Sequence, residues 1–393
     1  MTRDRRQVFL FDIDGVLVEP RGYRRATQAA VRHFLAGLAG EGFPLPGDEE
    51  YSWLEAQRIT SEWDMVPLFL GAVVEHLLAQ KLLPAPPPEL PSLASIRSQS
   101  GGVPPDYRGL IRPLLPYLSS GEYPAVTAFR LVQAGGPLFP HLAGTALSRL
   151  LFEDTRSLER SAATRLFQNL SLGAEAFRRV YRREPEVNSP SYLQTEDLPL
   201  LNPAKRERLL RSWSADEIDL AAYTLRPSLP PREARDPDAG YSPEAEMALA
   251  LVGLDQIPII GYGRILFLGQ RHGLGTGQLT KPAPVQALAA VHAALGRQEL
   301  PALEAALRLW QKGAGTHEFT PFDPGRGLLV HVFEDSAGGI EAVRQAGLLL
   351  NQSGFPAEVR AWGISSHPEK VRALEAAGVT VFPHIDAALD LAL

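Results

Sequence analysis

The hydrophobic pattern of this chain begins with an uninterrupted apolar run that leads directly into acidic residues. Residues 8–11, with the sequence VFLF, are all apolar, and Asp12, Asp14 and Gly15 follow them. A short continuous run, without alternation of apolar and polar positions, is typical of a strand buried on both faces in a parallel sheet. The pattern therefore predicts a buried strand that carries two carboxylates at its end.

Beyond residue 213 the pattern alternates between strand and helix. Strand-like runs lie at residues 220–224, 257–260, 265–268, 328–333, 358–364 and 379–382. Helical stretches accompany them at residues 243–252, 284–295, 300–311, 340–350, 368–377 and 386–393. Such alternation is typical of a parallel, doubly wound sheet. We therefore predict an α/β fold with a Rossmann-like core, whose first strand is the apolar run at residues 8–11.

The segment between these two parts shows helical spacing and no alternation typical of a sheet. Helices are expected at residues 23–38, within 51–83, from 127 to 181 with interruptions, and at 205–212. Residues 84–124 are rich in Pro, Gly and Ser, which indicates a long, lid-like connection, and residues 185–203 read as a loop. Two domains are predicted: a core from residues 1–19 and 214–393, and a mostly helical insertion at 20–213. Ser214 and Glu217 have the spacing of a capping box, which predicts a helix beginning there.

The composition and net charge of the chain exclude several kinds of site and argue against some kinds of partner. The chain has 393 residues, no cysteine and a formal net charge of −6. The absence of cysteine excludes disulfides and thiolate sites, and the negative charge argues against nucleic acid or an anionic membrane as the partner. No apolar run reaches the roughly 18 residues of a membrane-spanning helix. We expect a cytoplasmic protein. The spacing of the histidines disfavours a zinc site. The sequence gives no indication of the oligomeric state.

The two acidic residues after the first strand are the first candidate site. Asp12 and Asp14 are expected at the carboxyl end of a parallel strand, where open α/β folds place their ligands. Two crowded carboxylates repel each other, so the arrangement favours a divalent cation between them. The alternative is an ordinary Asp-Gly turn after a strand.

Four more candidates stand at strand ends or helix starts. Thr224 closes a strand and offers a hydroxyl for a phosphoryl oxygen, although a threonine is common in strands. Lys281 precedes Pro282 at an expected helix start, where the helix dipole favours an anion. Glu334 and Asp335 end another strand, and the alternative role of Asp335 is to cap the following helix.

In sequence order these features resemble the four motifs of the haloacid dehalogenase-like (HAD) superfamily of phosphohydrolases. The matching segments are FDIDGVLV, the strand that ends at Thr224, TKPAP, and FEDSAGGIEAVRQAG. The last segment is similar to the phosphatase and phosphomutase branch of the superfamily. The resemblance covers residues 8–18 and about 216–393. The insertion resembles the cap that this branch carries after the first motif, but it is far longer, so the chemistry of the cap does not transfer.

The resemblance implies a role for each candidate. Asp12 would be the nucleophile that forms an aspartyl-phosphate, and Asp14 the general acid and then the base. Mg²⁺ would be held by Asp12, the backbone carbonyl of Asp14 and Asp335, with Glu334 in or near its coordination shell.

The resemblance also implies that Thr224 and Lys281 hold the transferring phosphoryl oxygens. The leading interpretation is therefore a Mg²⁺-dependent phosphatase that acts on a small phosphorylated metabolite under a closing helical cap.

Other functions remain open at this point. A phosphomutase starts from the same aspartyl-phosphate, and a non-catalytic protein could keep the fold. Dehalogenation is disfavoured because Asp14 serves phosphoryl transfer, and phosphonate cleavage would need a lysine of the insertion, where Lys81 and Lys205 are the candidates. The glycine-rich residues 269–278 lack the strand-turn-helix context of a dinucleotide loop. Possible substrate anchors in the insertion, each also explained by a solvated helix face, are Arg24, Arg25, Arg130 and Arg156.

Overall fold

The computed structural model describes residues 5–35, 44–83, 85–86, 104–119, 122–234, 241–313 and 326–393. The chain divides into two compact units, one formed by residues 1–20 and 197–393 and the other by residues 21–196. Residues 197–213, which the sequence assigned to the insertion, therefore belong to the first unit. Among the described residues, no helix is long and apolar enough to cross a membrane.

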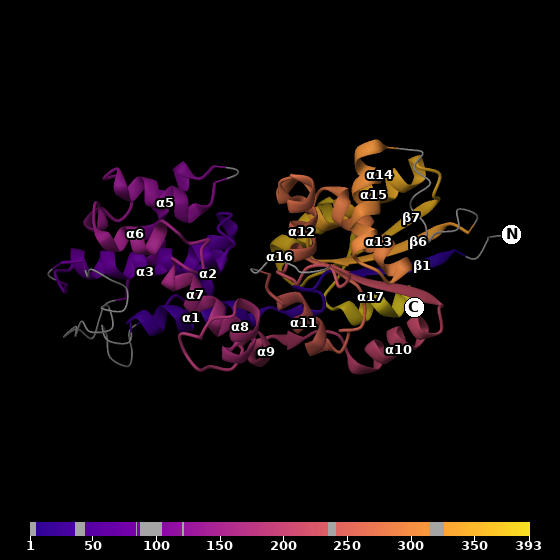
Figure 1. Ribbon diagram of the computed structural model, residues 1–393, viewed down its shortest axis with the longest axis horizontal. Helices are drawn as coiled ribbons and strands as arrows, with labels where there is room; N and C mark the ends of the chain where they lie inside the picture. Colours follow the sequence, from indigo (N-terminus) through magenta and orange to yellow (C-terminus); the bar gives the residue numbers. More distant parts are fainter. Residues whose placement is uncertain are drawn as a thin grey trace. The chain divides into compact units, whose positions relative to one another are not determined.

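The first unit is built on a six-stranded sheet in which every neighbouring pair of strands is parallel (Figure 1). Its strand order is β5-β4-β1-β6-β7-β8. The strands are β1 (Arg6–Phe11), β4 (Ile218–Tyr223), β5 (Ile259–Ile260), β6 (Leu328–Glu334), β7 (Ala357–Ile364) and β8 (Thr380–Phe382). The predicted α/β fold with a parallel core and a helical insertion is confirmed.

The central strand β1 is buried on both faces, which explains its continuous apolar sequence. Val8 and Leu10 pack into the core on one face of the sheet, and Phe9 and Phe11 pack into the core on the other. The first core is covered by α12 (Tyr262–His272), α13 (Pro284–Gly296), α14 (Leu300–Lys312) and α15 (Ala337–Gln352). The second is covered by α10 (Pro203–Ser214), α11 (Glu244–Val252) and α17 (Ile385–Ala392). Near β8, α16 (Pro368–Ala376) completes the helical layers.

Two local predictions were wrong. Residues 265–268 were expected to form a strand, but they lie inside α12, where Ile265 and Leu268 are buried one turn apart. A short apolar run does not by itself separate a strand from a buried helical segment. The capping box at Ser214 and Glu217 does not begin a helix: α10 ends at Ser214 and β4 begins at Ile218. Every other strand predicted beyond residue 213 overlaps an observed strand.

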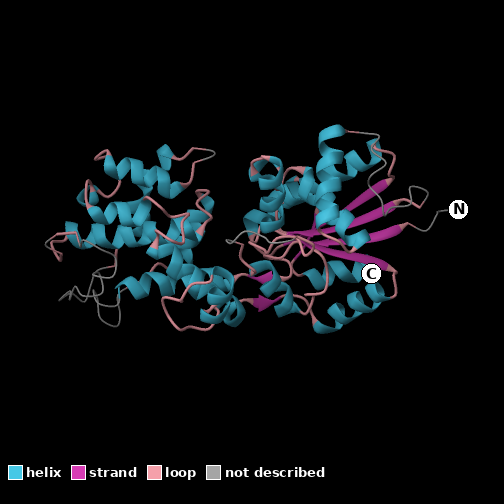
Figure 2. Cartoon of the chain, in the orientation of Figure 1, coloured by secondary structure: helices cyan, strands magenta, loops and turns pink. Residues whose placement is uncertain are grey.

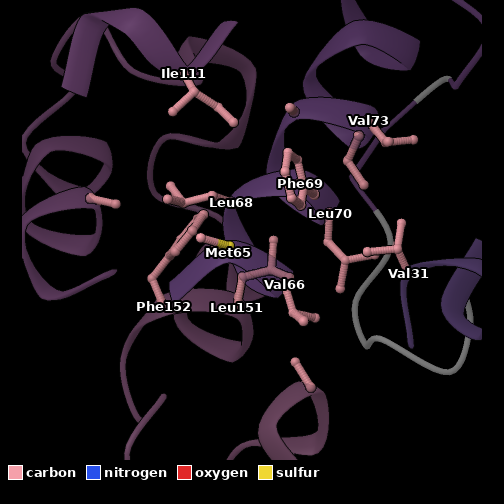
Figure 3. Close-up of a cluster of buried hydrophobic side chains, with 14 of the residues drawn as sticks. Val31, Met65, Val66, Leu68, Phe69, Leu70, Val73, Ile111, Leu151 and Phe152 are labelled. Carbon is pink, nitrogen blue, oxygen red and sulfur yellow. The ribbon is translucent and has the colours of Figure 1, made fainter. Parts of the chain in front are cut away.

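The described residues of the second unit form helices joined by loops and turns, with no strand among them (Figure 2). Its α-helices are α1 (Arg21–Leu35), α2 (Asp48–Ala56), α3 (Glu62–Ala79), α4 (Tyr107–Ile111), α5 (Pro124–Gln133), α6 (Ala146–Phe152), α7 (Ala162–Leu172), α8 (Ala174–Tyr181) and α9 (Tyr192–Glu196). The part of this unit that the structure describes also contains the 3₁₀ helices η2 (Arg112–Tyr117) and η3 (Pro140–Leu142). Most of α3 is buried, and Figure 3 shows its Met65 and Leu68 beside Phe152 of α6. Residues 84, 87–103 and 120–121 of the predicted long connection lie outside the described residues.

The chain passes between the two units at a short antiparallel pair of strands. β2 (Val18–Glu19) precedes the helical unit, β3 (Leu198–Pro199) follows it, and Glu19 pairs with Leu198. The backbone N–H of Leu200 also donates to the carbonyl of Leu17 at 2.8 Å. The predicted loop at residues 185–203 therefore contains both α9 and β3.

Candidate active site

The carboxyl ends of β1, β4 and β6 bring together residues that lie far apart in the sequence. Asp12 follows β1 directly, and its backbone N–H donates to the carbonyl of Phe333 in β6 at 3.0 Å. Thr224 follows β4, while Glu334 ends β6 and Asp335 comes next. Because neighbouring strands are parallel, all these residues share one edge of the sheet, where α/β folds bind ligands.

Three carboxylates cluster at this edge. Oxygen atoms of Asp12, Glu334 and Asp335 lie within 4.8 Å of one another, and all three residues are buried. Burial, followed by the charge of Glu334, raises the pKa of Asp12 to about 7. Burial also raises the pKa of Asp335 to about 6, partly opposed by Lys370. Crowded, buried oxygen ligands of this kind suit a hard divalent cation, which would offset their mutual repulsion.

Lys281 supplies positive charge to the same cluster. Its Nζ lies 3.1 Å from Asp12 Oδ1, 2.9 Å from Glu334 Oε2 and 3.8 Å from the centre of the Tyr223 ring. Burial alone would lower the pKa of Lys281, but the charges of Asp12 and Glu334 outweigh it and raise the pKa above the ordinary value. The lysine therefore stays charged in a site almost closed to water.

The first turn of α13 is fastened to the sheet near Lys281. The helix begins at Pro284, as the predicted range 284–295 does and two residues after Pro282, so Lys281 lies in the segment that leads into the helix. Gln286 of that turn donates from Nε2 to the carbonyls of Thr224 and Ile260, each at 2.8 Å. These hydrogen bonds hold the start of α13, and the segment with Lys281 that leads into it, beside the ends of β4 and β5.

Glu334 is surrounded by donors. Oε2 accepts from Lys281 and from the hydroxyl of Tyr223 at 2.7 Å, and Oε1 accepts from the hydroxyl of Ser336 at 2.6 Å. Gly339 makes room for this carboxylate, because a Cβ at that position would lie 2.1 Å from Glu334 Cδ. Through these contacts Glu334 orients Lys281. Because both of its oxygens already accept hydrogen bonds, Glu334 has less capacity to bind a cation than Asp335 has.

Asp335 borders the loop that carries Asp14. A Cβ on Gly15, whose φ is +78°, would lie 2.6 Å from Asp335 Oδ2, so glycine is required for this close approach. Lys370 of α16 also forms an ion pair with Asp335. The side chain of Lys370 is 52% exposed, so its amine could move into water if a cation bound to Asp335.

The side chain of Asp14 does not join the carboxylate cluster but pairs with Arg226. Asp14 Oδ1 accepts from Arg226 Nε at 3.0 Å and from Nη2 at 2.6 Å. Arg226 Nη2 also donates to Asp197 Oδ2 at 3.0 Å, and the Arg226 backbone N–H donates to the hydroxyl of Thr224 at 3.2 Å. Thr224 therefore lies at the predicted strand end, and its hydroxyl accepts a hydrogen bond from the loop that follows the strand.

Four residues of this site were missed from the sequence. Tyr223 and Arg226 flank Thr224 in the sequence YTLR, and a closer reading of that strand end could have found them. Asp197 and Lys370 carry no local signal. Asp197 lies in what read as a loop, and Lys370 sits on a helix of ordinary amphipathic composition.

The remaining candidates are engaged elsewhere. Within the helical unit, Arg24 pairs with Glu55, Arg130 with Glu122 and Arg156 with Asp64, and Arg25 Nε lies 3.9 Å from Glu196. Lys205 lies in the first unit, where it pairs with Asp390, so it is not a lysine of the insertion. Lys81 is exposed just after α3. The glycine-rich residues 269–278 span the end of α12 and a short 3₁₀ helix, η4 (Thr276–Gln278), and not a strand-turn-helix unit.

We expect Mg²⁺ to stabilise this protein more at pH 8 than at pH 5.5. The pKa values of Asp12 and Asp335 are raised to about 7 and 6 in the fold, against about 4 in an unfolded chain. The folded protein therefore binds more protons than the unfolded chain, and loses stability as pH rises from about 4 to 7. Bound Mg²⁺ would offset that loss, by about 2.7 kcal/mol when its concentration is 100 times its Kd.

Melting temperatures with and without Mg²⁺ at the two pH values measure this difference. Asp335→Asn removes a ligand, so it should abolish the shift at both. An equal shift at both pH values, or a shift kept by Asp335→Asn, would contradict the assignment of the cation site.

This chain is similar in structure to known proteins, but no match was found at the level of sequence. No protein-family model matches the sequence, and no curated protein matches it. A crystal structure of a Northeast Structural Genomics Consortium target is similar with a TM-score of 0.64 at 14% identity, covering 99% of this chain and 99% of that one. Phosphatase Tt82 from Thermococcus thioreducens is similar with a TM-score of 0.47 at 13% identity, covering 98% of this chain and 99% of its own. The first likeness concerns the fold and spans the helical unit as well as the α/β unit.

Proposed function

We propose that this chain is a Mg²⁺-dependent phosphohydrolase of the HAD type, which removes phosphate from a small phosphorylated metabolite through an aspartyl-phosphate on Asp12. One observation carries the proposal. At the carboxyl edge of a parallel sheet, a buried aspartate at the end of the central strand shares a cluster with two further carboxylates and with the amine of Lys281. This arrangement combines a nucleophile, ligands for a cation and a fixed positive charge, as phosphoryl transfer requires.

The donors at this edge fit Mg²⁺. Asp12, Asp335 and the backbone carbonyl of Asp14 would hold the ion, with Glu334 beside it, because Mg²⁺ prefers carboxylate, carbonyl and water oxygens. When bound, the ion would neutralise negative charge on the phosphoryl oxygens.

The residues of the chain would carry out two steps. In the first, the carboxylate of Asp12 forms a bond to phosphorus as the bond from phosphorus to the leaving oxygen breaks, and Asp14 gives that oxygen a proton. In the second, Asp14 takes a proton from a water molecule, which attacks phosphorus and frees Asp12. Lys281 would offset the charge that builds on the transferring oxygens, and Thr224 would help to orient them.

We also propose that the helical unit, residues 21–196, serves as a cap that controls access and substrate choice. Its two connections to the α/β unit meet at the β2–β3 pair, so a small set of backbone torsions beside Glu19 and Asp197 can change its orientation. A screen of cap variants, in which substrate preference changes while Mg²⁺ binding does not, would support this role.

A screen of phosphorylated metabolites, with free phosphate and isomerised product both measured, tests the proposed reaction. We expect phosphate release that requires Mg²⁺ and stops when the metal is chelated. A phosphomutase would give an isomerised product in place of free phosphate, because a second substrate hydroxyl and not water would accept the phosphoryl group. If no substrate forms a phosphoenzyme and no metal binds, the chain is a non-catalytic protein of this fold.

A further inference from the structure

Arg226 is a buried guanidinium held between two carboxylates that differ in exposure. Its side chain is 1% exposed, and it donates both to Asp14 and to Asp197. The side chain of Asp197 is fully buried, whereas that of Asp14 is 34% exposed. A buried guanidinium needs an anionic partner, since an unpaired charge in the interior is costly. Asp14 is thus the carboxylate that can separate from Arg226, whereas Asp197 remains paired with the guanidinium.

The backbone around Asp14 is tied to the same place in the chain as Asp197. Gly15 N–H donates to the carbonyl of Val18 at 2.8 Å, and Val18 belongs to β2, which pairs with β3. Asp197 immediately precedes β3 and is the first residue after the helical unit. The loop that carries Asp14 therefore lies next to the point where the chain enters the helical unit. Asp197 lies where the chain leaves it.

The contacts with Arg226 conflict with the role of proton donor. In this arrangement both oxygens of Asp14 accept hydrogen bonds from Arg226, at 3.0 and 2.6 Å for Oδ1 and 3.3 Å for Oδ2. The side chain of Asp14 also lies apart from the carboxylate cluster around Asp12, where the leaving oxygen would be. Asp14 must therefore turn away from Arg226 before it can reach that oxygen.

We propose that Arg226 is a positioning residue that holds Asp14 between turnovers, and that Asp197 retains the guanidinium when Asp14 turns toward the leaving oxygen. The proposal rests on the proposed function, because it assigns a holding site to the general acid of that reaction. It goes beyond that function by making proton delivery depend on Asp197, a residue that need not touch the substrate.

The test compares two substrates that differ in their need for a proton. Nitrophenyl phosphate has a good leaving group and needs little protonation, whereas an alkyl phosphate needs a general acid. Asp197→Asn removes one of the anions that pair with Arg226, so Asp14 should leave the guanidinium less readily. We expect kcat on an alkyl phosphate to fall about tenfold relative to kcat on nitrophenyl phosphate, with little change in KM. Arg226→Ala removes the group that holds Asp14, so it should not lower the ratio of the two kcat values as Asp197→Asn does.

Asp219→Asn is the matched control, because Asp219 is also buried and pairs with an arginine, Arg6, at the opposite end of β4. It should lower the melting temperature as Asp197→Asn does and leave the ratio of the two kcat values as in the wild type. An unchanged ratio in Asp197→Asn, or an equal fall on both substrates, would overturn the proposal while leaving the proposed function intact. A wild-type protein that releases phosphate from neither substrate would overturn the proposed function, and this inference with it.

Discussion

Asp12→Asn should abolish phosphate release and leave no phosphoenzyme, whereas Asp14→Asn should still be phosphorylated by nitrophenyl phosphate. In the proposed reaction Asp12 would provide the attacking oxygen, so its amide variant should lose roughly 10⁴-fold or more of the turnover on every substrate. Asp14→Asn would keep this nucleophile and the backbone carbonyl of residue 14 for the cation. It would remove the proton donor and the base of the second step, at a cost of about 10²–10⁴ on alkyl phosphates.

The Asp14 variant should also fold, because Arg226 retains Asp197 when Asp14 loses its charge. Mass spectrometry of acid-quenched protein should then show a lasting phosphorylated form for Asp14→Asn and none for Asp12→Asn. Mg²⁺-dependent melting in Asp14→Asn serves as the control for an intact cation site. If both variants lost labelling alike, or if Asp12→Asn remained active, the division of roles between the two aspartates would be wrong.

Lys281→Ala should lower turnover on all substrates by a comparable factor, on the order of 10²–10³. Lys281 pairs with Asp12 and Glu334, so in the proposed reaction it would act on the phosphoryl group that all substrates share. Its loss also leaves two buried carboxylates without their cation, which costs about 3–5 kcal/mol of stability in typical buried pairs. Steady-state kinetics on several phosphate esters, with melting curves, separate the two effects.

Lys205→Ala is the control for Lys281→Ala, because Lys205 pairs with Asp390 on α17 and has no contact with the carboxylate cluster. It should retain wild-type turnover. A large loss for one substrate and none for another in Lys281→Ala would instead assign Lys281 to substrate specificity.

The parallel sheet could be predicted because its strands carry their own signals. β1 is apolar on both faces, and each later strand is separated from the next by at least one helical stretch, so strand type and topology follow from pattern alone. The failures have a physical reason as well. Ile265 and Leu268 satisfy a buried strand and a buried helix equally well, and the boundary at residue 213 followed helix composition, which does not report that α10 packs on β4.

The grouping of Asp12, Glu334, Asp335 and Lys281 could be predicted because each lies next to a strand end or a helix start. The pairing of Asp14 with Arg226 could not. Arg226 also pairs with Asp197, which directly precedes β3 and whose neighbours in sequence give no periodic signal. Local pattern places residues along elements, but it does not report which buried charges meet across them.

The position of β1 at the centre of the sheet has a consequence for how the protein is made. β1 is synthesised well before its two neighbours, β4 and β6, which begin at Ile218 and Leu328. Until then the ribosome carries an apolar strand with both edges unpaired, which is the kind of segment that aggregates or recruits chaperones. The helical unit lies entirely within residues 21–196, so it can fold during this interval. Translation that slows after residue 196 would lengthen the exposure of β1 without delaying the helical unit.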